Sequence, residues 1–352
     1  MREALIGAGF RLLGATGLHR WMAPHLRGLG AVLMFHHVRP YEARAFAPNR
    51  MLEITPEFLD AALQRLRQLG YRILGLDAAL EELRDGTARS ASPFAVLTFD
   101  DGYRDNLVHA LPVLEKHRAP FTLFITTGFA ERSARLWWIE LEESVRRAER
   151  IDVRIEGEAM SLPARTAAEK SAAFAAVYWR LRAGPEGGLL AVIGDLANRQ
   201  GIDGRALVER YCMEWTEIEG LARHPLATIG AHTLTHPRLA RLEEAEMRTE
   251  LGAGRSLLEA RLARPVVHLA YPVGDPGSAG PREFRAASAF GYTSAVTTRP
   301  GLIHAVHRDH PTALPRVSVN GNWQDLRHFE VLLSGAAFAL WNRGRQLNVG
   351  EG

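Results

Sequence analysis

The sequence has little cysteine, no long apolar run and no marked excess of either charge, and each absence excludes a class of protein. Cys212 is the only cysteine among the 352 residues, which excludes an internal disulfide and the sulfur-rich zinc sites. Any bound metal must therefore be held by histidine and carboxylate side chains. No window approaches the roughly 20 consecutive apolar residues of a membrane span. We therefore expect no transmembrane segment.

The N-terminal residues and the balance of charges indicate where the protein is located and which partners it binds. The first residues lack the long apolar core and the cleavage site of a signal peptide, so we expect a cytoplasmic protein. Residues 3–22 predict a weakly amphipathic helix, which either packs on the domain, the interpretation we favour, or rests on a membrane surface. Lys and Arg number 43 against 40 Asp and Glu, so nucleic acid is not an expected partner. The sequence does not determine an oligomeric state.

Short apolar runs alternate with helical periodicity from residue 31 onward, which indicates parallel strands covered by helices. The fold class is therefore α/β. The expected strands cover residues 31–37, 71–76, 94–99, 121–126, 227–231, 266–270, 294–298 and 316–319. Their number suits a barrel.

The helical segments set the domain organisation that we expect. Thr55 and Pro56 predict the start of one helix, which Gly70 ends, and a second clear helix covers residues 243–262. Residues 1–30 form an N-terminal helix, residues 31–330 the barrel, and residues 331–352 a C-terminal helix and tail. Residues 131–225 interrupt the barrel as a mostly helical insertion.

Four tryptophans lie in or beside the helices expected in this insertion. They are Trp137, Trp138, Trp179 and Trp215. Aromatic side chains at helical spacing are more often core, although a sugar-stacking platform is an alternative.

Two adjacent carboxylates follow the apolar strand at residues 94–99. They belong to Asp100-Asp101-Gly102, at the carboxyl edge where barrels carry their catalytic residues. Adjacent like charges repel, so a bound cation would explain the pair. The alternative is an Asp-Gly turn with solvated side chains.

Two histidines follow another strand, at residues 227–231. His232 and His236 are four residues apart and converge if the segment between them turns helically. With one carboxylate they form a His-His-Asp set that leaves positions open for water and substrate, as in catalytic zinc sites. A structural role for the pair is the alternative.

These two segments resemble signature motifs of the polysaccharide deacetylase family, the NodB homology domain. Leu97-Thr98-Phe99-Asp100-Asp101-Gly102 is similar to its first motif and His232-Thr233-Leu234-Thr235-His236 to its second. Residues 33–38 resemble its early strand, 269–274 its third motif and 314–317 a later arginine motif. The resemblance extends over about residues 31–330, apart from the insertion.

The resemblance implies a distorted, TIM-like (β/α)₇ barrel and a hydrolase of carbon–nitrogen, non-peptide bonds. The family includes chitooligosaccharide, chitin and peptidoglycan deacetylases, so the expected partner is an acetylated amino-sugar oligo- or polysaccharide that loses N-acetyl groups. Asp101, His232 and His236 would bind Zn²⁺ or a similar ion such as Co²⁺. Asp100 would be the general base that accepts a proton from the attacking water.

The third motif implies further site residues. The backbone N–H of Val273 aligns with the family's donor to the tetrahedral oxyanion, and a backbone donor tolerates any side chain. Tyr271 either lines the sugar pocket or packs in the core.

Two departures from the family's pattern need compensation. Ala270 stands where the third motif usually opens with arginine, and Arg316 is our candidate for holding Asp100 charged and oriented, the alternative being a surface arginine that caps the last strand. A clean leucine-x-histidine motif near the C-terminus is missing. His304, His307 and His310 cluster in an expected loop, but the general acid stays unassigned.

His36 and His37 end the first strand. Neighbouring strand residues point to opposite faces, so only one of them can face inward. His36 matches the family's histidine, and we expect it to line the pocket. Two alternative functions remain open, namely a carbohydrate-binding barrel without turnover and an amidase acting on another non-peptide amide.

Overall fold

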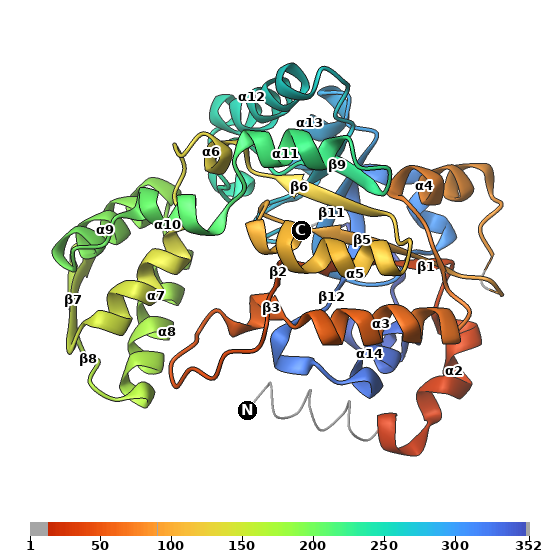
Figure 1. The fold of residues 1–352 in the computed structure, drawn as a ribbon, viewed down its shortest axis with the longest axis horizontal. Coiled ribbons are helices and arrows are strands. Elements are labelled where there is room, and N and C mark those ends of the chain that lie inside the picture. Colours follow the sequence, from red (N-terminus) through yellow and green to blue (C-terminus); the bar gives the residue numbers. More distant parts are fainter. Residues whose placement is uncertain (1–12, 90, 350–352) are drawn as a thin grey trace.

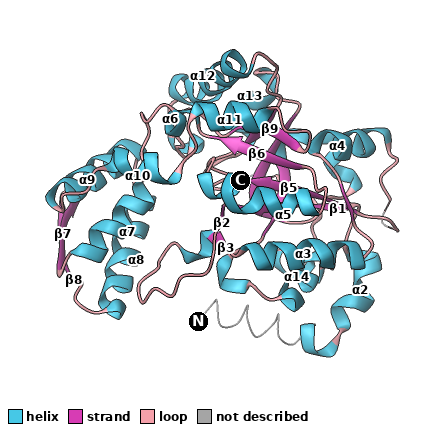
Figure 2. Cartoon of the chain, viewed as in Figure 1, coloured by secondary structure: helices cyan, strands magenta, loops and turns pink. Residues whose placement is uncertain are grey.

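The computed structural model describes residues 13–89 and 91–349. Seven parallel strands form a closed barrel in the order β1-β12-β11-β10-β9-β6-β5, and β5 pairs back with β1. The strands are β1 (Gly30–Phe35), β5 (Phe94–Phe99), β6 (Phe121–Ile125), β9 (Ala227–Ala231), β10 (His268–Ala270), β11 (Ser294–Pro300) and β12 (Leu314–Ser318). The predicted (β/α)₇ barrel is therefore confirmed, and Figure 2 shows these strands enclosed by helices.

One of the eight expected strands, at residues 71–76, lies outside the closed barrel. It is β4 (Arg72–Ile73), which pairs only with the start of β5. A separate short pair joins β2 (His37–Val38) to β3 (Glu53–Ile54). The first expected strand is therefore divided after Phe35, and His36 lies in the break.

The helices on the barrel begin and end much as their sequences predict. Thr55 caps α3 (Pro56–Gln68) by accepting the Phe58 N–H at 3.1 Å, and α12 covers Glu244–Leu262. The other helices on the barrel are α4 (Leu76–Asp85), α5 (Leu111–Lys116), α6 (Thr127–Ala130), α11 (Trp215–Ala222) and α13 (Pro281–Ala289). A π-helix at Asn106–Ala110 leads into α5, and short 3₁₀ helices cover Arg50–Leu52, Leu239–Arg241, Ala305–Asp309, Pro311–Ala313 and Gly321–Trp323.

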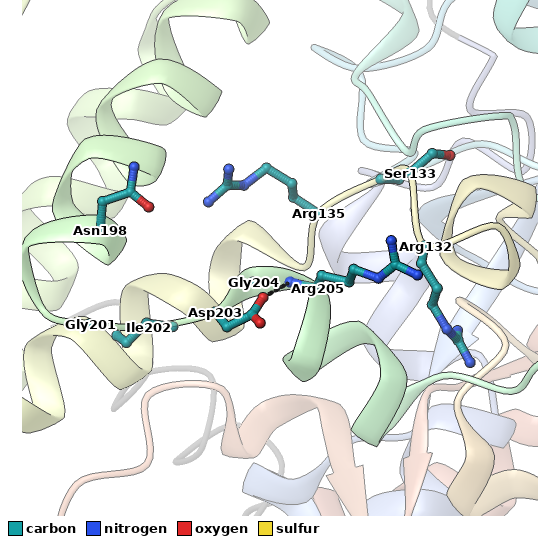
Figure 3. A pocket seen from close by; sticks show the side chains of 10 residues that line it. Arg132, Ser133, Arg135, Asn198, Gly201, Ile202, Asp203, Gly204 and Arg205 are labelled. Carbon is teal, nitrogen blue, oxygen red and sulfur yellow. Dashed lines mark hydrogen bonds between the residues drawn. The ribbon is translucent and has the colours of Figure 1, made fainter.

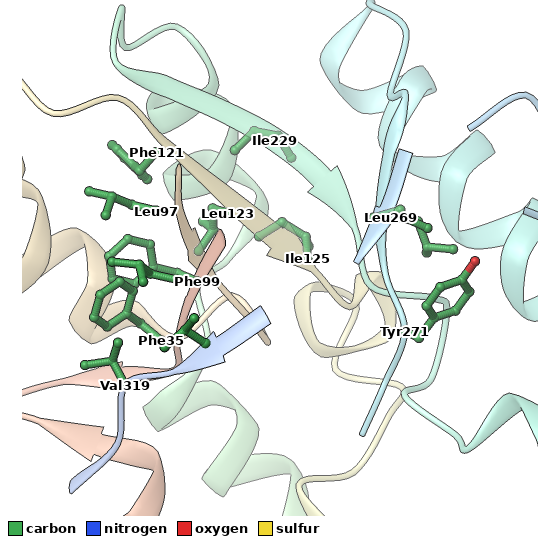
Figure 4. Close-up of a cluster of buried hydrophobic side chains, with 14 of the residues drawn as sticks. Phe35, Leu97, Phe99, Phe121, Leu123, Ile125, Ile229, Leu269, Tyr271 and Val319 are labelled. Carbon is green, nitrogen blue, oxygen red and sulfur yellow. The ribbon is translucent and has the colours of Figure 1, made fainter. Parts of the chain in front are cut away.

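Most residues on both faces of the barrel strands are buried, which explains their predominantly apolar sequences. Leu33, Leu97 and Leu123 belong to the cluster that packs under the surrounding helices, part of which Figure 4 shows. Their neighbours Val96 and Phe124 join a second cluster that takes members from strands all around the barrel and therefore fills its interior. This packing fixes the carboxyl ends of the strands at one end of the barrel.

The insertion packs around a hydrophobic cluster of its own. Its helices are α7 (Trp137–Arg147), α8 (Ala167–Ala183), α9 (Glu186–Arg199) and α10 (Gly204–Tyr211). It also contains an antiparallel hairpin, β7 (Arg150–Ile155) with β8 (Glu158–Pro163), in place of the mostly helical structure expected there. Figure 1 shows these elements as a lobe beside the barrel.

Three helices from the two ends of the chain pack together. They are α2 (Leu18–Leu26), α14 (Leu326–Leu333) and α15 (Ala336–Trp341), and α14 also contacts α3. Part of the predicted helix at residues 3–22 lies outside the described residues. None of the helices in the described part of the chain is both long and apolar enough to cross a bilayer.

Candidate metal and catalytic centre

The candidate residues gather at the carboxyl end of the barrel. His36 follows β1, Asp100 follows β5, His232 follows β9, and Arg316 belongs to β12. Because the strands are parallel, these positions lie at one end although the chain separates them widely.

Asp101, His232 and His236 converge on one point. Oδ1 of Asp101 lies 3.3 Å from Nε2 of His232 and 3.2 Å from Nε2 of His236. One potential ligand atom from each residue falls within 4.8 Å of the other two. Oδ1 of Asp101 is buried and accepts no hydrogen bond from any residue that the structure describes. A bare carboxylate oxygen between two imidazoles fits a divalent cation.

His232 is held in the tautomer that a metal ligand needs. Its Nδ1 lies 2.7 Å from the carbonyl oxygen of Ala270, which can only accept, so Nδ1 carries the proton. In the neutral imidazole the lone pair is therefore on Nε2, facing Asp101. Hydrogen bonds of this kind orient metal-binding histidines.

The backbone around the triad adopts left-handed conformations at several non-glycine residues. The φ angles are 71° at Asp101, 64° at Thr233 and 68° at His236. For β-branched Thr233 this conformation is costly. Glu250 of α12 offsets the cost, because its carboxylate accepts from the N–H groups of Leu234 and Thr235 at 2.9 and 2.8 Å. Nothing in the local sequence indicates this role of Glu250.

Arg316 contacts Asp100 directly, as expected if it replaces the arginine that the family usually has at the position of Ala270. Its guanidinium donates to Oδ1 at 2.8 Å and to Oδ2 at 2.7 Å, and its Nε donates to the carbonyl oxygen of Thr297 at 2.8 Å. Both side chains are buried. Burial by itself would raise the pKa of Asp100, but the charge and hydrogen bonds of Arg316, together with the charges of His232 and His36, keep the pKa below its usual value. Asp100 is therefore ionised beside the triad.

The two strand-end histidines have different surroundings. Nε2 of His36 lies 3.9 Å from Oδ2 of Asp100, whereas His37 is buried, bonds Asp105 through Nδ1 at 2.6 Å and stacks on Tyr103. Burial lowers the pKa of His36 more than the nearby carboxylates of Asp101 and Asp100 raise it. The expected alternation is present, and His36 is the histidine at the site.

The residues of the third motif separate into core and site. Tyr271 is fully buried, contacts Phe284, and donates its hydroxyl to the carbonyl oxygen of Thr312 at 2.8 Å. This placement gives it the packing role, so it does not support the expected lining of a sugar pocket. Val273 has φ 60°, and its N–H donates no hydrogen bond within residues 13–89 and 91–349. That donor remains available to a ligand.

Sequence and fold comparisons agree with this geometry. The sequence matches the polysaccharide deacetylase family over residues 88–179 and 190–295, more than half of the chain. The chain belongs to this family. No curated protein matches the sequence.

Solved deacetylase structures share the fold. Streptococcus pyogenes deacetylase PplD, determined with acetate, aligns with a TM-score of 0.57 and 17% identity over 86% of this chain and 97% of that chain. IcaB from Ammonifex degensii gives 0.53 and 18% over 86% and 96%, and the de-N-acetylase from Aggregatibacter actinomycetemcomitans gives 0.52 and 12% over 86% and 98%. At these identities the similarity establishes the fold alone.

The histidine cluster at residues 304–310 lies away from this deacetylase centre. Ile303 pairs with Gly30 at the beginning of β1, and the His304 ring lies close to Gly28. These positions are at the amino-terminal end of the barrel, opposite the triad. The cluster therefore does not supply the general acid.

The insertion contributes a wall of the centre. The Trp138 ring lies 5.0 Å from the His236 ring between centroids, and Trp138 Nε1 donates to the Tyr103 hydroxyl at 3.2 Å. Trp137 and Trp138 are buried, so neither forms an exposed sugar platform. From the sequence, Trp138 is an aromatic residue that either packs in the core or stacks on sugar, and Tyr103 carries no signal. The contacts of Trp138 with His236 and Tyr103 join segments that are distant in the sequence, so local patterns do not reveal them.

A cavity of about 550 Å³ lies where the insertion leaves the barrel. It is lined by residues 132–135 and by residues of α9 and α10 and the segment between them, and Figure 3 shows Arg135 extending toward Asn198. None of its lining residues belongs to the triad or contacts Asp100. The cavity is therefore separate from the centre.

Proposed function

We propose that this protein is a metal-dependent hydrolase that removes N-acetyl groups from amino sugars of a polysaccharide or oligosaccharide. The observation that carries the proposal is the bare Asp101 oxygen between His232 and His236, next to an Asp100 carboxylate held ionised by Arg316. The polysaccharide deacetylase family and the Aggregatibacter de-N-acetylase support an acetylated glycan as the substrate.

Asp101, His232 and His236 would hold the metal, with Zn²⁺ proposed first and Co²⁺ as a substitute. Such an ion, when bound, polarises the substrate carbonyl and lowers the pKa of the attacking water. Asp100 is the general base, since it is ionised and neighbours the triad. Arg316 orients both Asp100 oxygens without taking part in the proton transfer.

We assign the leaving-group proton to His36. An amine leaves poorly unless its nitrogen is protonated, and His36 lies nearest to Asp100 among the histidines outside the triad. Its lowered pKa makes the resting imidazole neutral. A neutral His36 can accept the proton that Asp100 gains and deliver it to the nitrogen. The free N–H of Val273, at the edge next to β9, is the proposed donor to the oxyanion.

The leaving group provides a test of His36. We expect His36→Ala to lower kcat on an acetamido sugar by about 100-fold or more, the usual range for a general acid. Hydrolysis of an aryl acetate should fall much less, because a phenolate leaves without protonation. Equal losses on both substrates would contradict the assignment.

The activity itself is tested by acetate release from an N-acetylated chitooligosaccharide with added Zn²⁺ or Co²⁺. The parent is compared with Asp100→Ala and His232→Ala, and exposed Asp85→Ala is the matched control. We expect release by the parent and the control only. Equal acetate release by the parent and all three variants would contradict the proposed activity.

Two competing functions give different results in the same assay. Glycan binding without acetate release would favour a carbohydrate-binding barrel, and release from small amides alone would favour an amidase. A panel of acetylated glycans, including peptidoglycan fragments, would then identify the preferred substrate.

A further inference from the structure

Two contacting helices from opposite ends of the chain present large apolar side chains to solvent. On α2, Leu18 is 50% exposed and Trp21 is 83% exposed; at the end of α15, Leu340 is 73% exposed and Trp341 is 50% exposed. We call these four side chains the α2–α15 surface. Leu18 and Trp21 are three residues apart and therefore share one face of α2. Burying four such side chains from water would be favourable.

The contact between α2 and α15 is close. Gly335, which precedes α15, packs so tightly on the carbonyl oxygen of Leu26 that an added Cβ would lie 2.2 Å from it. Gly335 has φ +79°, a left-handed conformation that glycine adopts without strain. The two helices therefore pack directly on each other, and α2 also contacts α14.

Positive charge predominates around this surface. Residues 13–29 and 331–349 contain no aspartate or glutamate, and Arg343 and Arg345 are exposed. Arg20 is exposed as well, but it donates to the carboxylate of Glu330 on α14 at 3.0 Å. His25 is exposed on α2 as well. Exposed tryptophan and leucine beside arginine, without an acidic neighbour in these segments, is the composition of helices that lie in a membrane interface.

The location of the surface leaves the catalytic end of the barrel free. Leu26 ends α2 just before Gly30 begins β1, so α2 lies near the amino-terminal end of the barrel. The triad lies at the carboxyl end. Figure 1 shows α2 and the insertion on opposite sides of the molecule. A partner on α2 would therefore not cover Asp100 or Asp101.

We propose that the α2–α15 surface docks on an anionic phospholipid bilayer. The tryptophan and leucine side chains enter the interface between headgroups and acyl chains, and the arginines contact the negative headgroups. Binding of this kind requires no spanning helix. The proposal does not depend on the deacetylase activity, so either can fail without the other.

The test is flotation of the full-length protein with vesicles of phosphatidylcholine alone or phosphatidylcholine mixed with phosphatidylglycerol. We expect binding to the mixed vesicles only, and release at high salt. Trp21→Ala combined with Trp341→Ala should weaken binding by at least about tenfold. Arg343→Gln with Arg345→Gln should weaken it by about 30-fold, from about 1 kcal/mol for each arginine near an anionic surface.

The matched control is Trp179→Ala, which removes a 67% exposed tryptophan from α8 of the insertion. Binding by this variant should equal that of the parent, and all variants should keep the parent's circular dichroism and acetate release. Failure of the parent to bind the mixed vesicles would overturn the proposal, as would an equal loss in the Trp179 variant. A dimer that Trp21→Ala and Trp341→Ala dissociate, without vesicle binding by the parent, would instead identify a second copy as the partner.

Discussion

Asp100 and Asp101 are adjacent in sequence, yet each has its own set of partners. The left-handed φ of 71° at Asp101 turns the chain between them, so that Asp100 faces Arg316 while Asp101 faces the two histidines. Aspartate adopts this conformation more readily than most residues. The turn therefore directs the two like charges to different partners.

Arg316 provides a prediction about orientation. Arg316→Lys keeps the charge but loses the forked pair of hydrogen bonds, so we expect kcat to fall by about 10- to 100-fold. Zn²⁺ affinity should change little, because Arg316 contacts Asp100 and no triad residue. Kinetics combined with chelator competition checks both. A large loss of Zn²⁺ affinity would show that Arg316 acts through the triad instead.

Removing the charge at the same position should affect stability. Arg316→Met leaves the Asp100 charge buried without its partner, and we expect a loss of about 3–5 kcal/mol in unfolding free energy. Adding Asp100→Ala to that variant should recover much of the loss, since no unpaired charge then remains. Urea denaturation of the single and double variants measures this, and equal stabilities would exclude the coupling.

Among the secondary-structure elements, α7 links the insertion to the catalytic end. The Trp138 ring packs on His236, and its indole N–H donates to Tyr103, whose hydroxyl interacts with Asp101. Met213, near the end of the insertion, also bonds the Gly102 carbonyl oxygen at 3.0 Å. The insertion therefore contacts both of the segments that carry the triad.

We expect Trp138→Phe to lower Zn²⁺ affinity by about tenfold, the smaller end of the range for residues that orient metal ligands. Trp137→Phe is the matched control, because Trp137 is equally buried on α7 but stacks on Tyr178. Chelator competition and the absorption spectrum of the Co²⁺ form are the measurements. If both variants weaken metal binding equally, the effect arises from packing of the insertion in general.

The short strand β3 carries a pH-dependent contribution to stability. Burial would raise the pKa of Glu53, but its hydrogen bonds with Arg44 and Arg39 hold the pKa below the usual 4.5. A depressed folded-state pKa stabilises the protein above the unfolded value, and this contribution is lost as the pH falls through the folded value. We therefore expect the difference in unfolding free energy between the parent and Glu53→Gln to be full at neutral pH and to shrink below about pH 4.5.

Urea denaturation over this pH range is the measurement, and Glu158→Gln is the control. Glu158 pairs with Arg180 but is 70% exposed, so its contribution should stay below about 1 kcal/mol at every pH. A difference for Glu53 that does not change with pH would contradict the assignment.

The sequence predicted those elements and contacts whose signals are local. The barrel strands β5, β6 and β9 are short, mostly apolar runs, and the motifs at Asp100 and His232 follow strand ends that a parallel barrel must bring together. The β7–β8 hairpin was missed although residues 150–155 alternate exposed and buried side chains and Glu156-Gly157 form the turn. Glu250 was missed for another reason, since its partners lie in the His232–His236 segment and nothing in α12 indicates them.

Across the whole molecule, the triad joins segments that follow β5 and β9, two barrel strands separated by β6. A cation held by Asp101, His232 and His236 would therefore link these two segments at the carboxyl end of the barrel. It would also neutralise a buried carboxylate oxygen that accepts no hydrogen bond in the described part of the chain. Binding only to the folded state stabilises it by mass action, by about 2.7 kcal/mol at a free metal concentration 100 times the Kd.

We expect Zn²⁺ to raise the Tm of the parent and chelation to reverse the rise without unfolding the protein, because the two core clusters of the barrel do not include the triad. Thermal denaturation of the parent, His236→Ala and exposed His25→Ala measures the effect, and a Tm rise that persists in His236→Ala would place the ion elsewhere.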